Sequence, residues 1–418
     1  MSHIRPFRGV LYNPEKIKDI AEVVTEPYDV INSSQQAAYY KLSPYNIIRL
    51  ILGRHYPDDN IKSNEYTRAR EYLRDWLKRD ILRRDGKESI YIYTQTFSHN
   101  NKMRTRTGFF VLLKIEDFAK NTVLPHENTK SSAVQDRMKL LEVTGANLSP
   151  IFALFSEPEG KISKLLNQEK KAQRPYITIK KDNITHRIWR ISQRKKIAAI
   201  QRQLLKRQIF IADGHHRYEA ALNYKLKMQK KKRAGVSSAP FNYVMAYLVS
   251  AKDPGLTILP THRVIKLAPG FNVDEIISKL KKAFIVYKFS SREELFSYMA
   301  SEAHSACVFG AYFGKKRFYG LKLKDAKLTR ELDVNVLHSV IVEEILNISP
   351  FQGDICYTRE AEEAIGLVDA DKNQAAFFLR PLRVAQVKKT AAAGRKMPHK
   401  STYFYPKALT GLVINKLK

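Results

Sequence analysis

The spacing of apolar residues predicts both helices and strands in the first part of the chain. Apolar positions within 69–81 recur every three or four residues, which is typical of an amphipathic helix, and the Asp-Gly pair at 85–86 would end it. Two β-rich runs follow at 89–97 and 106–115, separated by the turn-forming residues HNNK. We therefore predict a helix and then an antiparallel hairpin, whereas residues 1–52 look irregular.

A second group of predicted elements surrounds one short motif. The apolar run 209–212 predicts a buried strand that leads directly into the sequence DGHHR and a helical pattern. The basic residues 227–233 suit the end of that helix, and Gly235 would stop it. Residues 161–208 mix short strands with basic helix, and 241–250 read as another buried strand. The DGHHR motif is therefore expected at a strand-to-helix turn.

The last third alternates helices and strands. Its helix-like segments are 273–283, 293–302 and 334–346, and its strand-like segments are 307–313, 317–323 and 375–382. Mixed order without regular βαβ alternation predicts an α+β fold. A loop near Gly270 marks a weak domain boundary. We therefore expect an N-terminal α+β domain over 1–269 and a C-terminal α/β block over 270–418.

The composition is that of a folded protein. Of the 418 residues, 44% are hydrophobic and 11% aromatic, which excludes a disordered chain. No stretch approaches the roughly 20 consecutive apolar residues that cross a bilayer, and the N-terminal residues lack a secretion signal, so we expect a cytoplasmic protein. The two cysteines, Cys307 and Cys356, exclude a disulfide framework and a cysteine-rich zinc site.

Positive charge is concentrated in one segment. The formal net charge of the chain is +32, and 161–233 contains 22 Lys and Arg against 4 Asp and Glu, a balance of 22 − 4 = +18. Such a segment attracts nucleic acid, anionic membrane or phosphorylated ligands. A solvated basic surface without a partner explains the same composition.

The DGHHR motif has the composition of an anion site. A helix start leaves backbone N–H groups without intrahelical acceptors and carries the positive end of the helix dipole. Gly214 permits close approach of a ligand, and Arg217 with His215 or His216 can donate charge-assisted hydrogen bonds to phosphate. Asp213 is a candidate helix cap, magnesium ligand or general base.

A second candidate site is the sequence PHENT. A carboxylate beside an imidazole, as in His126-Glu127, serves as a general base or metal ligand. The motif is not a HExxH zinc signature, because Lys130 stands where the second histidine is needed. An ordinary polar turn remains the alternative.

The third candidate is the sequence MPHKST near the C-terminus. Counted from Gly394, it approaches a P-loop with Lys400 and Ser401 in register, but His399 replaces the glycine that lets backbone amides wrap a phosphate. We reject a P-loop and keep Lys400, Ser401 and Thr402 as phosphate contacts.

Two weaker signals accompany these motifs. Arg263 follows Thr261-His262 at the end of an expected strand, where it either reaches the same pocket or forms a structural pair. The pair Tyr28-Asp29 lies in the irregular opening segment, where an Asx-turn explains the aspartate equally well.

These motifs resemble known proteins. IADGHHRYEAAL resembles the phosphate-binding motif of the ParB/sulfiredoxin-like fold, to which free serine kinases belong. Nearly the whole chain is similar to a bacterial and archaeal family of unknown function, through EPYDVI, LPHENT, ADGHHRYEAAL, DPGLTILPTHR, LDVNVLH and MPHKSTYFYPK. One departure is Glu26, which replaces the first proline of the family's Pro-Pro-Tyr-Asp. The resemblance implies a mixed-sheet, nucleotide-binding core.

The leading hypothesis is a nucleotide-dependent kinase for a small hydroxyl compound. The DGHHR residues would hold the phosphates of ATP or ADP, and either Asp213 or Glu127, beside His126, would deprotonate the acceptor while the other helps hold Mg²⁺. Lys400 and Arg263 would neutralise developing charge. Free L-serine as acceptor is implied by the resemblance alone. The alternatives are a nucleotide-gated, ParB-like nucleic-acid-binding protein and a scaffold that binds a nucleotide without turnover.

Overall fold

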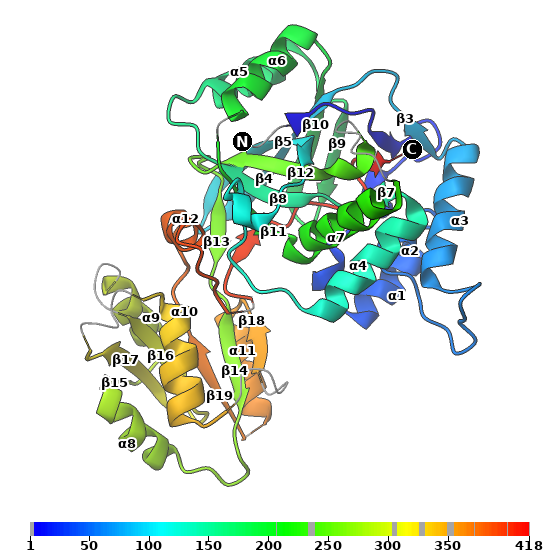
Figure 1. Ribbon diagram of the computed structural model, residues 1–418. Coiled ribbons are helices and arrows are strands. Elements are labelled where there is room, and N and C mark those ends of the chain that lie inside the picture. The colour runs from blue at the N-terminus through cyan, green and yellow to red at the C-terminus, as the bar shows by residue number, and fades with distance from the viewer. Residues whose placement is uncertain are drawn as a thin grey trace. The chain divides into compact units, whose positions relative to one another are not determined.

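The chain forms two compact units, each with its own sheet (Figure 1). The computed structural model describes residues 4–205, 207–232, 239–302, 307–325, 331–348, 355–371, 373–398 and 400–417. The first unit consists of Met1–Pro125, Thr129–Thr257 and Pro406–Lys418, and the second of His126–Asn128 and Ile258–Tyr405. Arg233, Gly235 and His399, which entered the sequence predictions, lie outside the described residues.

The first unit is built on a nine-stranded mixed sheet. Its strand order is β6-β11-β8-β12-β5-β4-β10-β9, with β1 paired to β5. The pairs β8–β12 and β6–β11 are parallel and the others antiparallel. The pairs β2–β3 and β7–β21 form two separate small sheets in this unit. The strands of the unit are β1 (Ile4–Arg5), β2 (Val10–Tyr12), β3 (Leu82–Arg84), β4 (Ile90–His99), β5 (Lys102–Lys114), β6 (Val123–Leu124), β7 (Ala146–Asn147), β8 (Ile151–Phe155), β9 (Ile177–Lys181), β10 (Ile184–Ile191), β11 (Ile209–Asp213), β12 (Tyr243–Ser250) and β21 (Asn415–Lys416).

One face of this sheet is covered by helices. Apolar residues of α4, α5, α6 and α7 pack with those of the central strands in a single core, and α4 and α7 lie side by side (Figure 1). On the other face, the C-terminal segment is held by hydrogen bonds from Gln95 to the Lys407 carbonyl and from Arg106 to the Pro406 carbonyl. The helices of the unit are η1 (Ile20–Glu22), η2 (Tyr28–Val30), α1 (Ser33–Leu42), α2 (Ile48–Ile51), α3 (Glu65–Lys78), η3 (Phe118–Lys120), α4 (Ser131–Thr144), α5 (Lys161–Ala172), α6 (Arg194–Leu204), α7 (His215–Lys232) and η4 (Pro240–Asn242).

The second unit contains a six-stranded sheet whose described pairs are all antiparallel. Its order is β15-β17-β16-β19-β14-β18. Helices α8, α10 and η6 pack on one face, and α9 and α11 on the other. Its elements are β14 (His262–Lys266), α8 (Val273–Ala283), β15 (Phe284–Phe289), α9 (Arg292–Ser301), β16 (Val308–Tyr312), β17 (Phe318–Leu323), α10 (Asp333–Val336), the π-helix η6 (Leu337–Ile345), β18 (Ile355–Thr358), α11 (Ala361–Ala370), β19 (Gln374–Phe378), α12 (Val384–Ala392) and β20 (Tyr403–Tyr405); β13 (Thr257–Leu259) crosses the boundary.

The division between the units falls earlier than the boundary expected at Gly270. Strand β14 precedes that glycine, yet it pairs with β18 and β19 in the sheet of the second unit. The expected N-terminal domain is one contiguous segment, whereas the first unit also contains the last residues of the chain.

Most expected elements are present, with two differences. The hairpin of β4 and β5 turns through Asn100 and Asn101, which both have positive φ, and β11 leads into α7 as predicted. The opening segment is not irregular, because it contains α1 and α2. Helix α3 ends at Lys78, short of the expected Ile81, and β3 follows it. No helix in the described part of the chain is long and apolar enough to cross a membrane.

Candidate functional site

The DGHHR motif forms a tight turn between β11 and α7. Strand β11 pairs antiparallel with β8, and the register shifts between Ile211 and Asp213. Gly214 has a φ of +89°, a backbone conformation that side chains with a Cβ rarely adopt. Helix α7 begins at His215, and its first turn contains no acidic side chain. The dipole at this helix start is therefore not compensated within its own first turn.

Asp213 holds two cations beside that turn. Its Oδ2 accepts a hydrogen bond from Nη2 of Arg217 at 2.6 Å, and its Oδ1 accepts one from Nζ of Lys407 at 2.5 Å. The exposed fractions of the three side chains are 14% for Asp213, 10% for Arg217 and 7% for Lys407. Burial acts to raise the pKa of Asp213, but Lys407 and Arg217 outweigh it and hold the pKa at about 2.

This pairing limits the chemistry available to Asp213. A carboxylate with a pKa of about 2 is a weak base near neutral pH. Both oxygens already accept from cations, and the adjacent positive charges repel Mg²⁺, so Asp213 does not fit the magnesium role that its sequence context allows. Among the described residues, the group with metal-ligand spacing is the partly exposed set His55, Asp59 and Glu65, which includes neither Asp213 nor Glu127.

Arg217 is held from several sides. Its Nη1 donates to the Pro150 carbonyl, while its Nε is buried and has no hydrogen-bond partner within the described structure. Arg217 and Arg137 both line a cavity of about 50 Å³. The guanidinium of Arg137 lies 4.0 Å from the ring centre of Tyr28. Burial raises the pKa of Tyr28 to about 12, and Arg137 and Arg217 oppose that shift, so the weak Tyr28 signal belongs to this neighbourhood.

The two histidines of the motif differ in their surroundings. His215 is buried, with 5% of its surface exposed. Nε2 of His216 accepts a hydrogen bond from the Lys130 backbone N–H at 3.0 Å, which requires that nitrogen to be unprotonated. Burial lowers the pKa of His216 and outweighs the charges of Asp29 and Glu219, which act to raise it. His216 therefore orders the segment after PHENT through Nε2, and only its other ring nitrogen could donate to a phosphate.

The PHENT motif is divided between the two units. Thr129 belongs to the first unit, where its hydroxyl donates to Glu219 of α7 at 2.5 Å. His126–Asn128 belong to the second, where the Met397 backbone N–H donates to the His126 carbonyl at 2.7 Å. The relation of His126 and Glu127 to the DGHHR turn stays a prediction.

Within the second unit, PHENT and MPHKST meet. Oε1 of Glu127 accepts hydrogen bonds from the backbone N–H and the hydroxyl of Thr402, at 3.3 and 3.1 Å. Nε2 of His126 lies 2.9 Å from the same hydroxyl. Because that hydroxyl donates to Glu127, the hydrogen bond to His126 needs a proton on Nε2. The cluster couples an acid, a hydroxyl and an imidazole.

Arg263 lies near this cluster, on β14. It is 1% exposed, its Nη1 donates to the Thr261 carbonyl and its Nη2 to the Lys400 carbonyl at 3.4 Å, and its Nε is buried without a partner among the described residues. Burial lowers the pKa of Arg263 to about 10, while Tyr357 and Glu127 oppose that shift. Arg263 is the second residue of β14, not the end of a strand as expected.

The other MPHKST residues are placed by backbone turns. Lys400 has a φ of +56°, and its Nζ lies 5.3 Å from the ring centre of Tyr357. The hydroxyl of Ser401 donates to the Pro398 carbonyl at 2.6 Å, and Ser401 is 6% exposed. Ser401 therefore has a structural partner already, whereas Lys400 presents a charged group over an aromatic face.

Sequence reasoning assigned no role to Lys407 or Arg137. Both stand at or beside motifs that the sequence marks, Lys407 at the end of MPHKSTYFYPK and Arg137 after PHENT, but neither motif shows what these side chains contact. Lys407 reaches Asp213 across 194 positions of the chain, so no local pattern could have paired them.

Gly214 provides a direct test of this turn. A Cβ at this position would lie 3.0 Å from Cζ, Nε and Nη2 of Arg217, and the backbone would keep its φ of +89°. We expect Gly214→Ala to lower the free energy of unfolding by about 1–3 kcal/mol, measured by urea denaturation. Gly86→Ala is the matched control, since no atom lies within 4 Å of the added Cβ. Equal stability of the two variants would contradict the strain described here.

Comparisons with known proteins give a family without an assigned activity. A family model described as "Protein of unknown function (DUF1015)" matches residues 4–335. No curated protein matches the chain.

Three solved structures are similar over most of the chain. A mutant free serine kinase in complex with ADP has 12% identity and a TM-score of 0.36, covering 72% of this chain and 88% of its own. A conserved hypothetical protein from Pyrococcus furiosus has 14% identity and a TM-score of 0.36, with 74% and 95% covered. SbnI from Staphylococcus aureus, truncated at its C-terminus, has 10% identity and a TM-score of 0.38, with 72% and 85% covered. TM-scores of this size do not establish a function, which has to be inferred from the residues of this chain.

Proposed function

Because the chain belongs to DUF1015, a family whose description assigns no reaction, we propose from its own residues that it is a nucleotide-dependent phosphotransferase acting on a small hydroxyl compound. ATP or ADP is the proposed donor. Free L-serine as acceptor, and a ParB/sulfiredoxin-like fold for the first unit, rest on the resemblance of the DGHHR stretch alone. The observation that carries the proposal is the pair of cations that Asp213 holds at the start of α7.

The charges at this turn favour a bound phosphate. Lys407 and Arg217 carry two positive charges against the single charge of Asp213, so the triad has a net charge of about +1. The dipole of α7 adds positive potential at the same place. Nε of Arg217 is a buried donor that lacks an acceptor among the described residues, and a phosphate oxygen or a water would supply one. Phosphoryl transfer depends mainly on such positioning and charge neutralisation.

The proposal gives each residue a distinct role. Asp213 is a positioning residue that keeps Arg217 and Lys407 in place, and Gly214 lets the backbone approach the ligand. Glu127, coupled to Thr402 and His126, is the proposed base on the chemistry of its cluster alone. Mg²⁺ would enter with the nucleotide, and we assign it no protein ligand.

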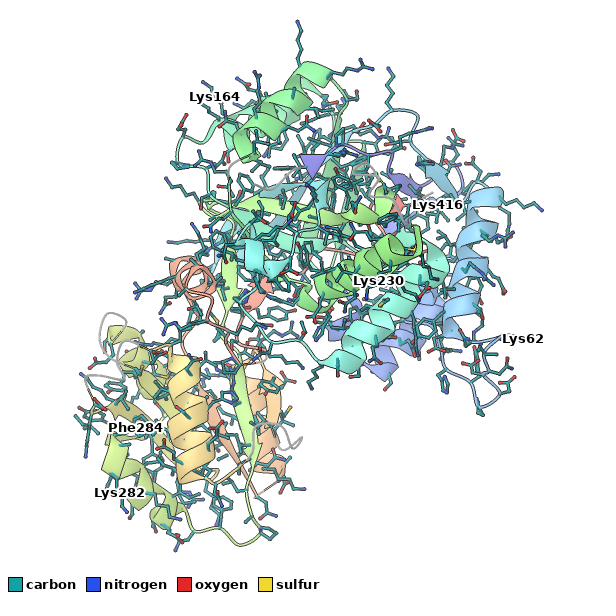
Figure 2. The ribbon with its side chains drawn as sticks, in the orientation of Figure 1. Lys62, Lys164, Lys230, Lys282, Phe284 and Lys416 are labelled. Carbon is teal, nitrogen blue, oxygen red and sulfur yellow. The ribbon has the colours of Figure 1, made fainter. Side chains whose placement is uncertain are left out.

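Phosphorus NMR tests the reaction directly. The protein is incubated with Mg²⁺, ATP or ADP, and a panel of small hydroxyl compounds that includes L-serine. We expect a new phosphomonoester signal, and a rate at least tenfold lower for Arg217→Lys, because a lysine cannot contact both Asp213 and Pro150 as the guanidinium does. Lys230→Gln, an exposed change on the same helix (Figure 2), is the matched control and should keep the wild-type rate.

Two outcomes would contradict the proposal. Equal rates for Arg217→Lys and Lys230→Gln would remove the DGHHR turn from the reaction. Nucleotide binding without product from any acceptor would favour the alternatives, a nucleotide-binding scaffold or a nucleotide-gated nucleic-acid-binding protein. The nucleic-acid alternative has its own support in exposed cations on α5 and α6, namely Lys161, Lys164, Lys171, Arg194, Lys195 and Arg202.

A further inference from the structure

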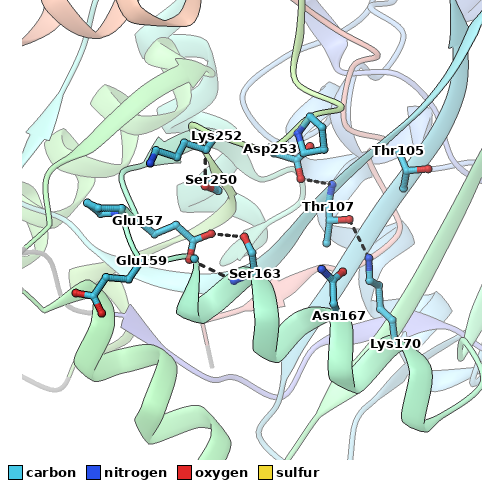
Figure 3. A pocket seen from close by; sticks show the side chains of 13 residues that line it. Thr105, Thr107, Glu157, Glu159, Ser163, Asn167, Lys170, Ser250, Lys252 and Asp253 are labelled. Atoms are coloured by element: carbon cyan, nitrogen blue, oxygen red, sulfur yellow. Dashed lines mark hydrogen bonds between the residues drawn. The ribbon is translucent and has the colours of Figure 1, made fainter.

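A second cleft lies at the other end of the strands that carry the DGHHR turn. Its volume is about 520 Å³, and it lies where β8 and β12 end and α5 begins (Figure 3). Asp213 pairs with Phe152 near the start of β8, whereas the cleft lies beyond Phe155 at its end. The three residue steps from Phe152 to Phe155, at about 3.3 Å each, place the two regions at least about 10 Å apart along the strands.

Asp253 is a half-buried acidic group of this cleft. It belongs to the DPGL sequence, which the proposed phosphotransfer does not use. Its Oδ2 accepts a hydrogen bond from the Thr107 backbone N–H at 3.1 Å and its Oδ1 from that of Gly255 at 2.9 Å. Burial raises the pKa of Asp253 to about 6 despite these bonds and the charges of Arg106 and Lys170. The carboxylate is thus fixed in place without an ion-pair partner in the described structure.

Lys170 is a half-buried basic group of the same cleft. Its Nζ donates to the Thr107 hydroxyl at 3.1 Å, so Thr107 lies between Lys170 and Asp253 (Figure 3). Burial lowers the pKa of Lys170, and the charge of Asp253 opposes that shift. No ion pair within 4.0 Å joins these two described residues. Each charge therefore carries a burial penalty that the other does not fully relieve.

The remaining charged groups at the cleft are already engaged or exposed. Glu157 caps α5 by accepting from the backbone N–H groups of Ile162 and Ser163, at 3.0 and 3.2 Å. That helix start is thus not available to a phosphate. Glu159 pairs with Lys161 at the surface, and Lys252 is exposed. Asp253 and Lys170 are the half-buried charges that a ligand would meet.

We propose that this cleft binds a small zwitterion with the charge pattern of a free amino acid, its ammonium group toward Asp253 and its carboxylate toward Lys170. Such a ligand supplies both missing counter-charges at once. The neutral polar groups of the lining, Thr105, Ser163, Asn167 and Ser250, suit the polar remainder of a small molecule. The cleft is separate from the proposed phosphate site, so the ligand here is not the phosphate donor.

Calorimetry on the full chain without nucleotide tests this proposal. The probes are the free amino acids, followed for any that binds by its singly charged analogues, for example L-alanine against propionate and ethylamine. We expect at least tenfold weaker binding for each analogue and for Lys170→Met and Asp253→Asn. Lys164→Met, an exposed change on the same helix (Figure 2), is the matched control and should bind as the wild type does.

Several results would overturn the proposal. The first is that no free amino acid binds at a concentration of about 10 mM. The second is that the singly charged analogues bind as tightly as the amino acid. The third is that binding is unchanged in both cleft variants. The analogue comparison uses the wild-type chain, so it decides the matter even if a variant fails to fold. Arg217→Lys should keep wild-type amino-acid binding, which separates failure here from failure of the proposed phosphotransfer.

Discussion

Replacing Asp213 by alanine is expected to lower the free energy of unfolding by about 3–5 kcal/mol. The substitution leaves Arg217 and Lys407 buried beside each other without the carboxylate that joins them. Removing one partner of a buried ion pair is costly because the remaining charge stays desolvated. Urea denaturation at neutral pH measures the change, and Asp58→Ala at an exposed position is the control, with an expected change within about 0.5 kcal/mol.

A double-mutant cycle identifies the cause. If the loss in Asp213→Ala comes from the unpaired cations, adding Lys407→Met should recover part of it, because one buried charge is removed. Additive losses in the double variant would show that the two side chains do not interact as described. A loss no larger than that of Asp58→Ala would contradict the burial of the triad.

Local pattern was sufficient for the elements that carry the DGHHR turn. The apolar run 209–212 is buried on both faces, so it reads as a strand, and the glycine after Asp213 marks the change of direction. The hairpin of β4 and β5 is also predictable from the sequence, because two asparagines, which adopt positive φ more readily than most residues, form its turn.

The spacing of apolar residues did not predict helix α1. Helix α1 has no buried residue, so no apolar stripe marks it. Its signal is a capping box, in which Asn32 accepts from the Gln35 backbone N–H and Gln35 accepts from that of Asn32. Reading N-x-x-Q at 32–35 would have found the helix start.

Tertiary pairing was beyond the reach of sequence patterns. Lys407 pairs with Asp213 and leaves its carboxylate a weak base, and only the return of the C-terminal segment to the first unit brings the two residues together. The division of PHENT has the same origin, because His126 pairs with the segment around Met397. Residue types suggested candidate chemistry, whereas the contacts of each group depend on partners that are remote in the chain.

The stability of the protein should also depend on pH through Asp253. The pKa of this carboxyl is about 6 in the folded protein, raised from 3.8 mainly by burial. Between about pH 4 and 6 the folded chain therefore holds a proton that the unfolded chain has lost, so this group's contribution to stability is greatest below pH 4 and falls as pH rises through 6. Asp253→Asn lacks this term. Relative to wild type, the variant should gain about 2 kcal/mol between pH 4 and 7.5.

Urea denaturation of wild type and variant at pH 4 and at pH 7.5 measures this gain. The difference in free energy of unfolding between the two chains is determined at each pH, and the two differences are compared. The hydrogen bonds that the carboxylate accepts from the Thr107 and Gly255 backbone are already contained in its pKa of about 6, and the difference between an amide and a neutral carboxyl is the same at both pH values and cancels. Titration of the histidines and other carboxyls is common to both chains and cancels as well. Asp58→Asn, an exposed change, should show no such gain. The stability of Asp253→Asn relative to wild type could instead be the same at both pH values, or rise toward low pH. Either result would mean that the folded chain already compensates the buried charge of the carboxylate, and the proposed zwitterion site would lose its electrostatic basis.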